Sequence, residues 1–144
     1  MKLINPLLDM LRFRMVRINV EQFAILANDV PAGNITIDTN IGVKASVADR
    51  KIALEIQFDF SSVTENVLIL KQLCEFEIHE EDWATLQTEG KVTIPKELIE
   101  YFVVQTVGTA RGILHCKTEG TPFNHLILPP LNAAEMIEHD VVIE

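Results

Sequence analysis

The sequence predicts an α+β fold, in which one long helix and a short C-terminal helix pack on a four-stranded antiparallel sheet. Three observations predict it. The first half of the chain alternates apolar and polar residues with a period of two, as half-buried strands do. The links between these segments are short, which favours an antiparallel meander with a crossover over β-α-β units. The second half changes to a helical period after a proline that suits the first turn of a helix.

Four segments of the first half carry strand patterns. The first has apolar residues on both parities, which indicates burial on parts of both faces, and the turn-rich stretch Asn28–Gly33 then breaks it. The third alternates most cleanly, with apolar residues on one face and polar residues on the other. The fourth is apolar on both faces at its start and charged on one face at its end. The four predicted strands are Arg12–Leu26, Asn34–Val47, Lys51–Ser61 and Val67–His79.

Helical signals dominate the second half. Glu80–Leu86 predicts a short helix with acids near its N-terminus, and Thr88–Thr93 predicts a loop or a short strand. Lys96–Lys117 predicts a long helix whose polar face is so thin that neighbours must cover it on more than one side. Gly108 lies inside this helix, where a glycine costs about 1 kcal/mol, so a break into two helices is the alternative. A last short helix is predicted at Ala133–His139.

Composition limits both the organisation and the function. A chain of 144 residues has the size of one ordinary domain, and we expect residues 1–144 to form a single domain. The 12 basic and 21 acidic residues give a net charge of −9, which argues against a general nucleic-acid binder and against docking on an anionic membrane. The hydrophobic fraction of 48% is too high for intrinsic disorder. The longest uncharged stretch contains three prolines, so we expect no membrane insertion.

The two cysteines bear on the compartment. Cys74 and Cys116 lie far apart within apolar sequence and form no CxxC pair. We interpret both as free core thiols of a cytosolic protein, and a disulfide is the alternative. A cytoplasmic location is therefore predicted.

No motif of catalysis, metal binding or cofactor binding stands out. The histidines form neither HxxxH nor HExxH, the serines form no GxSxG elbow, and there is no glycine-rich phosphate loop. We therefore predict that the protein is not an enzyme and uses neither a metal nor a cofactor. The enzyme alternative requires a deep pocket that gathers His115, His125 and a carboxylate.

The chain has more apolar residues than one small core requires. They gather in the strands with two apolar faces, in the long helix and in the loop after it. We expect part of this surface to be an oligomer interface and part to bind apolar segments of other chains. Gly108 and Gly112, four residues apart, allow close approach of another helix or strand. The alternative is that a second layer inside the protomer covers all of it.

Three short segments resemble the SecB-like family, whose order of elements is the one predicted above. The first, with an aromatic residue ahead of an Arg-Ile step and a proline beyond the crossover, looks like the family's first strand. The second, an Ala-Arg step that leads to Gly-Thr, is similar to the end of the family's main helix. The third resembles the proline-bearing segment ahead of the family's last helix. In order, they are Phe13–Ile18 with Glu21–Phe23 and Pro31, Ala110–Thr121, and Leu126–Asn132.

The resemblance implies an assembly and an activity. The assembly is a homotetramer built as a dimer of dimers. The activity is that of an ATP-independent chaperone, or holdase, which binds unfolded polypeptides or preproteins in apolar grooves, in protein export or linked to a toxin–antitoxin system. An export motor or an antitoxin would then be a further partner. The alternative is a SecB-fold oligomer that binds one dedicated partner and lacks general chaperone activity.

The resemblance also guides the choice of site residues. We expect apolar residues of the first strand, the crossover and the late loop to bind polypeptide, with core packing as the alternative for each. Trp83 joins them as an amphipathic aromatic suited to a contact surface. Glu75 and Glu77, on one strand face, are expected to dock a basic partner, unless that face is simply solvated. The predicted polypeptide-binding residues are Ile18, Phe23, Val30, Pro31, Trp83, Phe123, Leu128 and Pro129.

Overall fold

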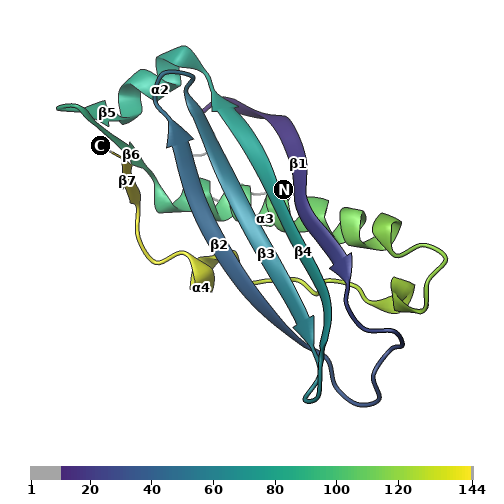
Figure 1. Cartoon of the computed structure of the whole chain (residues 1–144). Coiled ribbons are helices and arrows are strands. Elements are labelled where there is room, and N and C mark those ends of the chain that lie inside the picture. Colours follow the sequence, from purple (N-terminus) through teal and green to yellow (C-terminus); the bar gives the residue numbers. More distant parts are fainter. Residues whose placement is uncertain (1–10, 144) are drawn as a thin grey trace, which may run out of the picture.

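In the computed structural model, which describes residues 11–143, one long helix crosses one face of a four-stranded antiparallel sheet (Figure 1). The predicted fold class is confirmed. A second, three-stranded sheet lies toward the N-terminal end of the long helix. In chain order the elements are β1 Phe13–Ile25, β2 Thr36–Ser46, β3 Lys51–Ser61, β4 Asn66–Ile78, α2 Glu80–Leu86, β5 Gln87–Thr88, β6 Lys91–Ile94, α3 Lys96–Lys117, the 3-10 helix η1 Pro122–His125, α4 Ala133–Met136 and β7 Val141–Ile143.

The strands of the large sheet lie in the order β1-β4-β3-β2, and every neighbouring pair is antiparallel. β2, β3 and β4 form a meander. The chain leaves β1 through a crossover, residues 26–35, which passes the end of the sheet to reach β2 (Figure 1). β1 and β2 are therefore the two edges of this sheet.

β1 contains two β-bulges, at Val16 and at Glu21, where its register with β4 shifts. Side chains alternate along a strand, so the extra residue of a bulge changes which positions face α3. The residues that face α3 are odd-numbered before the first bulge, even-numbered between the two, and odd-numbered again after the second. The prediction that this strand is buried on parts of both faces is therefore wrong. One face is apolar throughout, and the bulges make it look two-sided in the sequence. The residues of this face, each paired with an α3-facing residue of β4, are Phe13, Met15, Ile18, Val20, Phe23 and Ile25.

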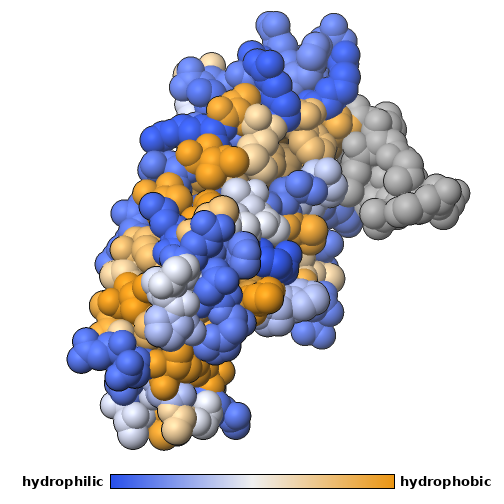
Figure 2. Space-filling view, turned by 90° about the vertical axis from the view of Figure 1, so that its right-hand side faces the viewer, coloured by the Kyte–Doolittle hydropathy of each residue, from blue (hydrophilic) through white to orange (hydrophobic). Residues whose placement is uncertain are grey.

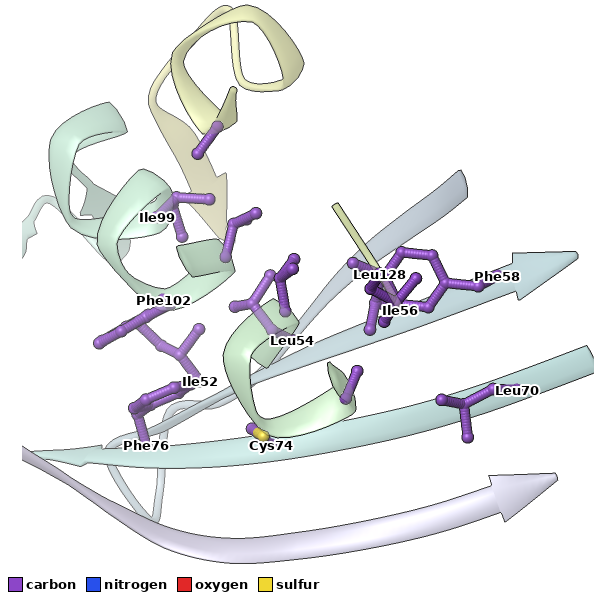
Figure 3. Packing of buried hydrophobic residues seen from close by; sticks show 14 of the residues in the cluster. Ile52, Leu54, Ile56, Phe58, Leu70, Cys74, Phe76, Ile99, Phe102 and Leu128 are labelled. Atoms are coloured by element: carbon purple, nitrogen blue, oxygen red, sulfur yellow. The ribbon is translucent and has the colours of Figure 1, made fainter. Parts of the chain in front are cut away.

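The core lies between α3 and the sheet. Phe102 of α3 stacks on Phe76 of β4, with ring centroids 4.0 Å apart (Figure 3), and meets the edge of the Phe13 ring at 5.2 Å. The segment after α3 covers another side of this helix, and its Leu128 and Ala133 are buried in the same cluster. Cover on more than one side is what the thin polar face of the helix predicts. The helix runs through Gly108 without a break.

The small sheet was only partly predictable. β5 and β6 form a hairpin whose turn residues, Glu89 and Gly90, have φ angles of 50° and 80°. Positive φ at both positions matches the twist of the flanking strands in a two-residue hairpin. The helix predicted at Ala133–His139 ends at Met136 instead, and the chain then extends into β7, which pairs with β6.

A buried polar pair lies under α3. Gln72 Nε2 donates to Cys74 Sγ at 2.9 Å, whereas Gln72 Oε1 accepts no hydrogen bond from the described residues. Burial raises the pKa of the Cys74 thiol, because the charged thiolate is disfavoured away from water. Both cysteines are free, and Cys74 is the core thiol that the sequence predicts. Cys116 is free as predicted, but its predicted position in the core is wrong, since residue 116 is exposed on α3.

Candidate functional site

An apolar groove lies between α3 and the extended segment after η1. It has a volume of about 250 Å³. Val104 on its α3 side is 53% exposed, so the groove is open to solvent. We call the groove formed by these six residues the α3 groove: Val103, Val104, Val107, Arg111, Pro130 and Leu131.

Arg111 fixes the wall of the α3 groove that faces the helix. Its Nε donates to the carbonyl oxygen of Leu128 at 2.7 Å, and its Nη2 donates to that of Pro129 at 3.2 Å. These carbonyls belong to an extended stretch outside the strand ladders, so they need donors from elsewhere. The planar guanidinium offers two donors in a fixed geometry, which suits adjacent carbonyls. Arg111 therefore holds the segment in place while its side chain forms part of the groove.

A flat stripe on α3 faces solvent beside the groove. Tyr101 and Val104 are 37% and 53% exposed, and Gly108 and Gly112 continue the stripe at helical spacing. A Cβ added at either glycine would meet no described atom within 4 Å. We call Tyr101, Val104, Gly108 and Gly112 the glycine stripe. Its lack of side chains at two positions allows another helix to approach closely.

The α3-facing side of β1 is only partly covered. Ile18 on this side is 53% exposed and Phe23 is half-buried, while Val16, at the first bulge, is 37% exposed. Val30 and Pro31 of the crossover are half-buried as well. On the side of the molecule where β1 lies, apolar patches alternate with polar ones (Figure 2). These residues of β1 and the crossover form a second apolar surface, separate from the residues that line the α3 groove.

The outer face of the sheet, away from α3, is charged, and several of its charges are paired. Arg14 of β1 meets Glu77 of β4 at 3.1 Å, and Arg17 meets Glu75 at 3.3 Å. The sequence correctly places both glutamates on one face. Each carboxylate is nevertheless held by an arginine of the adjacent strand, so a basic partner would have to compete for it.

A row of four charges crosses this outer face. Glu55 of β3 lies 3.3 Å from Lys44 of β2 and 3.6 Å from Lys71 of β4, and it shares a hydrogen bond with Glu21 at the second bulge of β1. Partial desolvation and the bond to Glu55 raise the pKa of Glu21. The same bond, with help from Lys44, lowers the pKa of Glu55. The opposite directions mean that, as the pH falls, Glu21 takes up a proton before Glu55 does.

This proton makes stability depend on pH. A carboxyl whose pKa is raised by folding stabilises the protein when it is protonated, and that contribution is lost as pH rises through the folded pKa. Glu21→Gln, which mimics the protonated form, is expected to raise the melting temperature at about pH 8 and to change it little at about pH 4. Glu65→Gln, in the exposed β3–β4 turn, is the control and should shift both values alike. An equal response of the two variants in thermal unfolding would argue against the raised pKa of Glu21.

With this geometry in place, comparison with solved structures identifies the fold. One match is the Mycobacterium tuberculosis SecB-like chaperone Rv1957 in complex with a ChAD peptide from the HigA1 antitoxin Rv1956, with a TM-score of 0.56. The match covers 83% of this chain and 91% of that chain at 19% sequence identity. The fold is SecB-like. No family model matches the sequence, and a search of curated proteins gives no match.

Within this SecB-like fold, part of the predicted polypeptide-binding set is accessible. Ile18 and Pro129 are exposed, and Phe23, Val30 and Pro31 are half-buried. Four of these residues belong to β1 and its crossover. Pro129 lies beside the α3 groove, where its carbonyl accepts from Arg111. The predicted residues therefore do not converge on one site.

Three predicted residues are buried, and a surface position for them is wrong. Trp83, Phe123 and Leu128 are 3%, 2% and 1% exposed. Trp83 lies on the inner side of α2, and Phe123 is turned inward by η1, which Thr121 caps by accepting from the Phe123 N–H. Leu128 points into the cluster that holds Ile56 and Phe58 (Figure 3). All three belong to the hydrophobic core of this chain.

Sequence reasoning missed the residues of α3 that line the groove, Val104, Val107 and Arg111. A signal was present, since Val103, Val104 and Val107 extend the apolar surface around the helix beyond one stripe. It does not say which valine is covered, because that depends on where the segment after η1 crosses the helix.

The histidines of the enzyme alternative are engaged locally and separately. His115 Nδ1 lies 3.5 Å from the amide nitrogen of Asn124, and His125 Nδ1 donates to the carbonyl oxygen of Pro122 at 2.7 Å. Residues 11–143 contain no group of three or more His, Cys, Asp or Glu side chains placed to hold a metal ion. No helix in that range has the length and apolarity needed to cross a bilayer.

Proposed function

We propose that this protein is an ATP-independent chaperone that binds extended apolar segments of unfolded polypeptides in the α3 groove. The observation that carries the proposal is an open apolar groove on a SecB-like fold, with one wall tied down by Arg111. The solved chaperone with the same fold holds a peptide, which supports the same role here. The clients would be unfolded chains, in protein export or in a toxin–antitoxin setting.

The physical chemistry of the groove suits a holdase. Such a protein binds the unfolded state and shifts its equilibrium by mass action, with no need for a nucleotide. Apolar contacts contribute about 25 cal/mol per Å² of buried surface, so affinity builds up over several weak contacts. Among the described residues, β1 and β2 are the outer strands of the large sheet, and their edges offer further backbone pairing for an extended client.

Assembly is part of the proposal. We infer a homotetramer, a dimer of dimers, in which the glycine stripe packs against its copy in another protomer. Gly108 and Gly112 remove the side chains that would keep two helices apart, and Val104 supplies apolar area. The partly exposed residues of β1 offer a second apolar contact surface.

A dedicated partner is the second candidate function. The solved SecB-like chaperone binds a peptide of an antitoxin, which favours a single protein partner as an alternative to many clients. A basic partner at Glu75 and Glu77 would have to displace Arg17 and Arg14, so recognition there would weaken at high salt. Weak binding to unrelated clients, with tight binding to one peptide, would identify this case.

An aggregation assay tests the proposal. The wild-type protein is expected to suppress aggregation of several unfolding clients at a ratio of about one tetramer per client, without nucleotide. Val104→Asp places a charge in the α3 groove and is expected to weaken suppression by about tenfold or more, because an unpaired charge opposes apolar burial. Gln105→Glu makes the same change of charge on the next, exposed residue and should act like the wild type.

Light scattering on the same samples separates binding from assembly. Val104 also belongs to the glycine stripe, so the mass decides between its two roles. If Val104→Asp keeps the wild-type mass and loses suppression, the groove binds the clients; loss of both would place Val104 in the protomer interface and contradict client binding at this residue. No suppression of any client by the wild type, or equal suppression by both variants, would contradict the proposed function.

A further inference from the structure

β7 fills the free edge of β6 in a specific way. Val141 pairs with Ile94 and Ile143 pairs with Val92, and both β6 residues are buried. Val142, between them, is 53% exposed. The edge of β6 therefore accepts a strand in which two apolar side chains turn inward and the one between them stays in solvent.

The residue ahead of β7 adds a polar element of recognition. Asp140 Oδ1 accepts a hydrogen bond of 2.8 Å from the backbone N–H of Lys96, in the first turn of α3. Pro95, at the N-cap, makes no side-chain capping bond, so a carboxylate 44 residues away in sequence supplies the cap. The helix dipole favours a negative charge at this end. The site as a whole selects an aspartate followed by apolar, variable and apolar residues.

Few contacts hold β7 in this place. It has three residues, against 11 in β2 and 13 in β1, and its two inward side chains are only half-buried. In the connection from α4, residues 137–140, only Ile137 is half-buried, and the other three residues are exposed. A short edge strand of this kind opens far more readily than the whole domain unfolds. Opening uncovers the β6 edge and the N-terminus of α3 together.

We propose that the β6 edge and the N-terminus of α3 form a strand-acceptor site for another polypeptide, and that β7 occupies this site in the absence of that partner. The partner is an extended segment with the chemistry of Asp140–Ile143. It displaces β7, pairs with β6 and restores the cap on α3, which is strand addition at a sheet edge. The inference rests on the proposed function only in that both concern extended polypeptides. No residue of this site lines the α3 groove.

The test uses the full chain and a fluorescein-labelled peptide of residues 138–143, with binding followed by fluorescence anisotropy. Ile143→Asp charges an inward position of β7 and is expected to free the β6 edge. Val142→Asp makes the same change on the exposed neighbour and is the matched control. We expect the peptide to bind Ile143→Asp at least about tenfold more tightly than it binds the wild type or Val142→Asp. Alanine in place of the peptide's aspartate is expected to weaken binding about fivefold, through loss of the cap.

Circular dichroism first shows whether the variants fold, and the milder pair Ile143→Ser and Val142→Ser replaces them if Ile143→Asp does not. Equal binding to all variants would overturn the proposal, and so would no binding to a folded Ile143 variant. A wild-type dimer that exchanges β7 between copies, without peptide capture, would overturn the choice of partner. The peptide assay depends on substitutions in β7, whereas the aggregation assay depends on Val104→Asp in the α3 groove, so this site and the proposed function fail separately.

Discussion

Phe102→Ala is expected to lower the free energy of unfolding by about 3–5 kcal/mol, the range found when a buried phenylalanine is truncated. The ring is fully buried, stacks on Phe76 at 4.0 Å and meets the edge of Phe13 at 5.2 Å. It therefore joins α3 to β4 and to β1 at one point. Its removal leaves a cavity that the rigid sheet cannot close. Urea denaturation, repeated at several protein concentrations because assembly adds stability, gives the measurement.

The matched control for this prediction lies on the same helix. Gln105→Ala removes a side chain from the exposed face of α3 and should change the free energy of unfolding by no more than about 0.5 kcal/mol. Similar small losses in both variants would mean that Phe102 does not lie in the core that the sheet and α3 form.

Arg111→Ala is expected to lower the free energy of unfolding by about 2–4 kcal/mol and to weaken client binding as well. The substitution removes the donors to the carbonyls of Leu128 and Pro129, and these carbonyls have no strand partner. The segment after η1 then loses its attachment to α3, and the α3 groove loses its defined width. Thermal unfolding and the aggregation assay, performed on the same preparation, measure the two effects.

Two controls separate geometry from charge. Arg111→Lys keeps the charge but lacks the planar pair of donors, so it should recover only part of the loss. Lys117→Ala removes a positive charge from the exposed end of α3 and should leave stability within about 0.5 kcal/mol of the wild type. Full recovery by lysine would show that the charge of Arg111 matters and its two hydrogen bonds do not.

The large sheet could be predicted because its signals are local. β3 shows one uninterrupted alternation, with Ile52 and Phe60 at its ends, and its predicted limits are those of the structure. The long helix was predictable from its period and from Pro95 ahead of it. The prediction of which β1 residues share a face was wrong, because a bulge shifts the alternation of side chains and no residue type in the sequence indicates it. Val16 and Glu21 are ordinary strand residues, and only the register with β4 shows what they do.

Contacts between distant segments could not be predicted from the sequence, and both the α3 groove and the β6 edge depend on such contacts. β7 forms a strand because it pairs with the edge of β6 and because Asp140 caps the N-terminus of α3. The three-residue sequence of β7 contains no sign of either distant contact. Trp83 and Leu128 are chemically suited to contact a partner, yet both lie in the core. The chemistry of a side chain does not reveal whether its backbone directs it inward or outward. Composition indicated surplus apolar surface; the path of the segment after η1 decides where part of it becomes a groove.

The strand order also affects how the chain folds during synthesis. β1 is the first of the described strands to be made, but its partner in the sheet is β4, which begins about 40 residues later. At roughly 5–20 residues per second, β1 leaves the ribosome and remains without its partner strand for about 2–8 s. For that time Phe13, Met15 and Ile18 belong to a nascent apolar segment whose backbone is unpaired. A newly made copy is therefore, for those seconds, the kind of chain that the folded protein is proposed to hold.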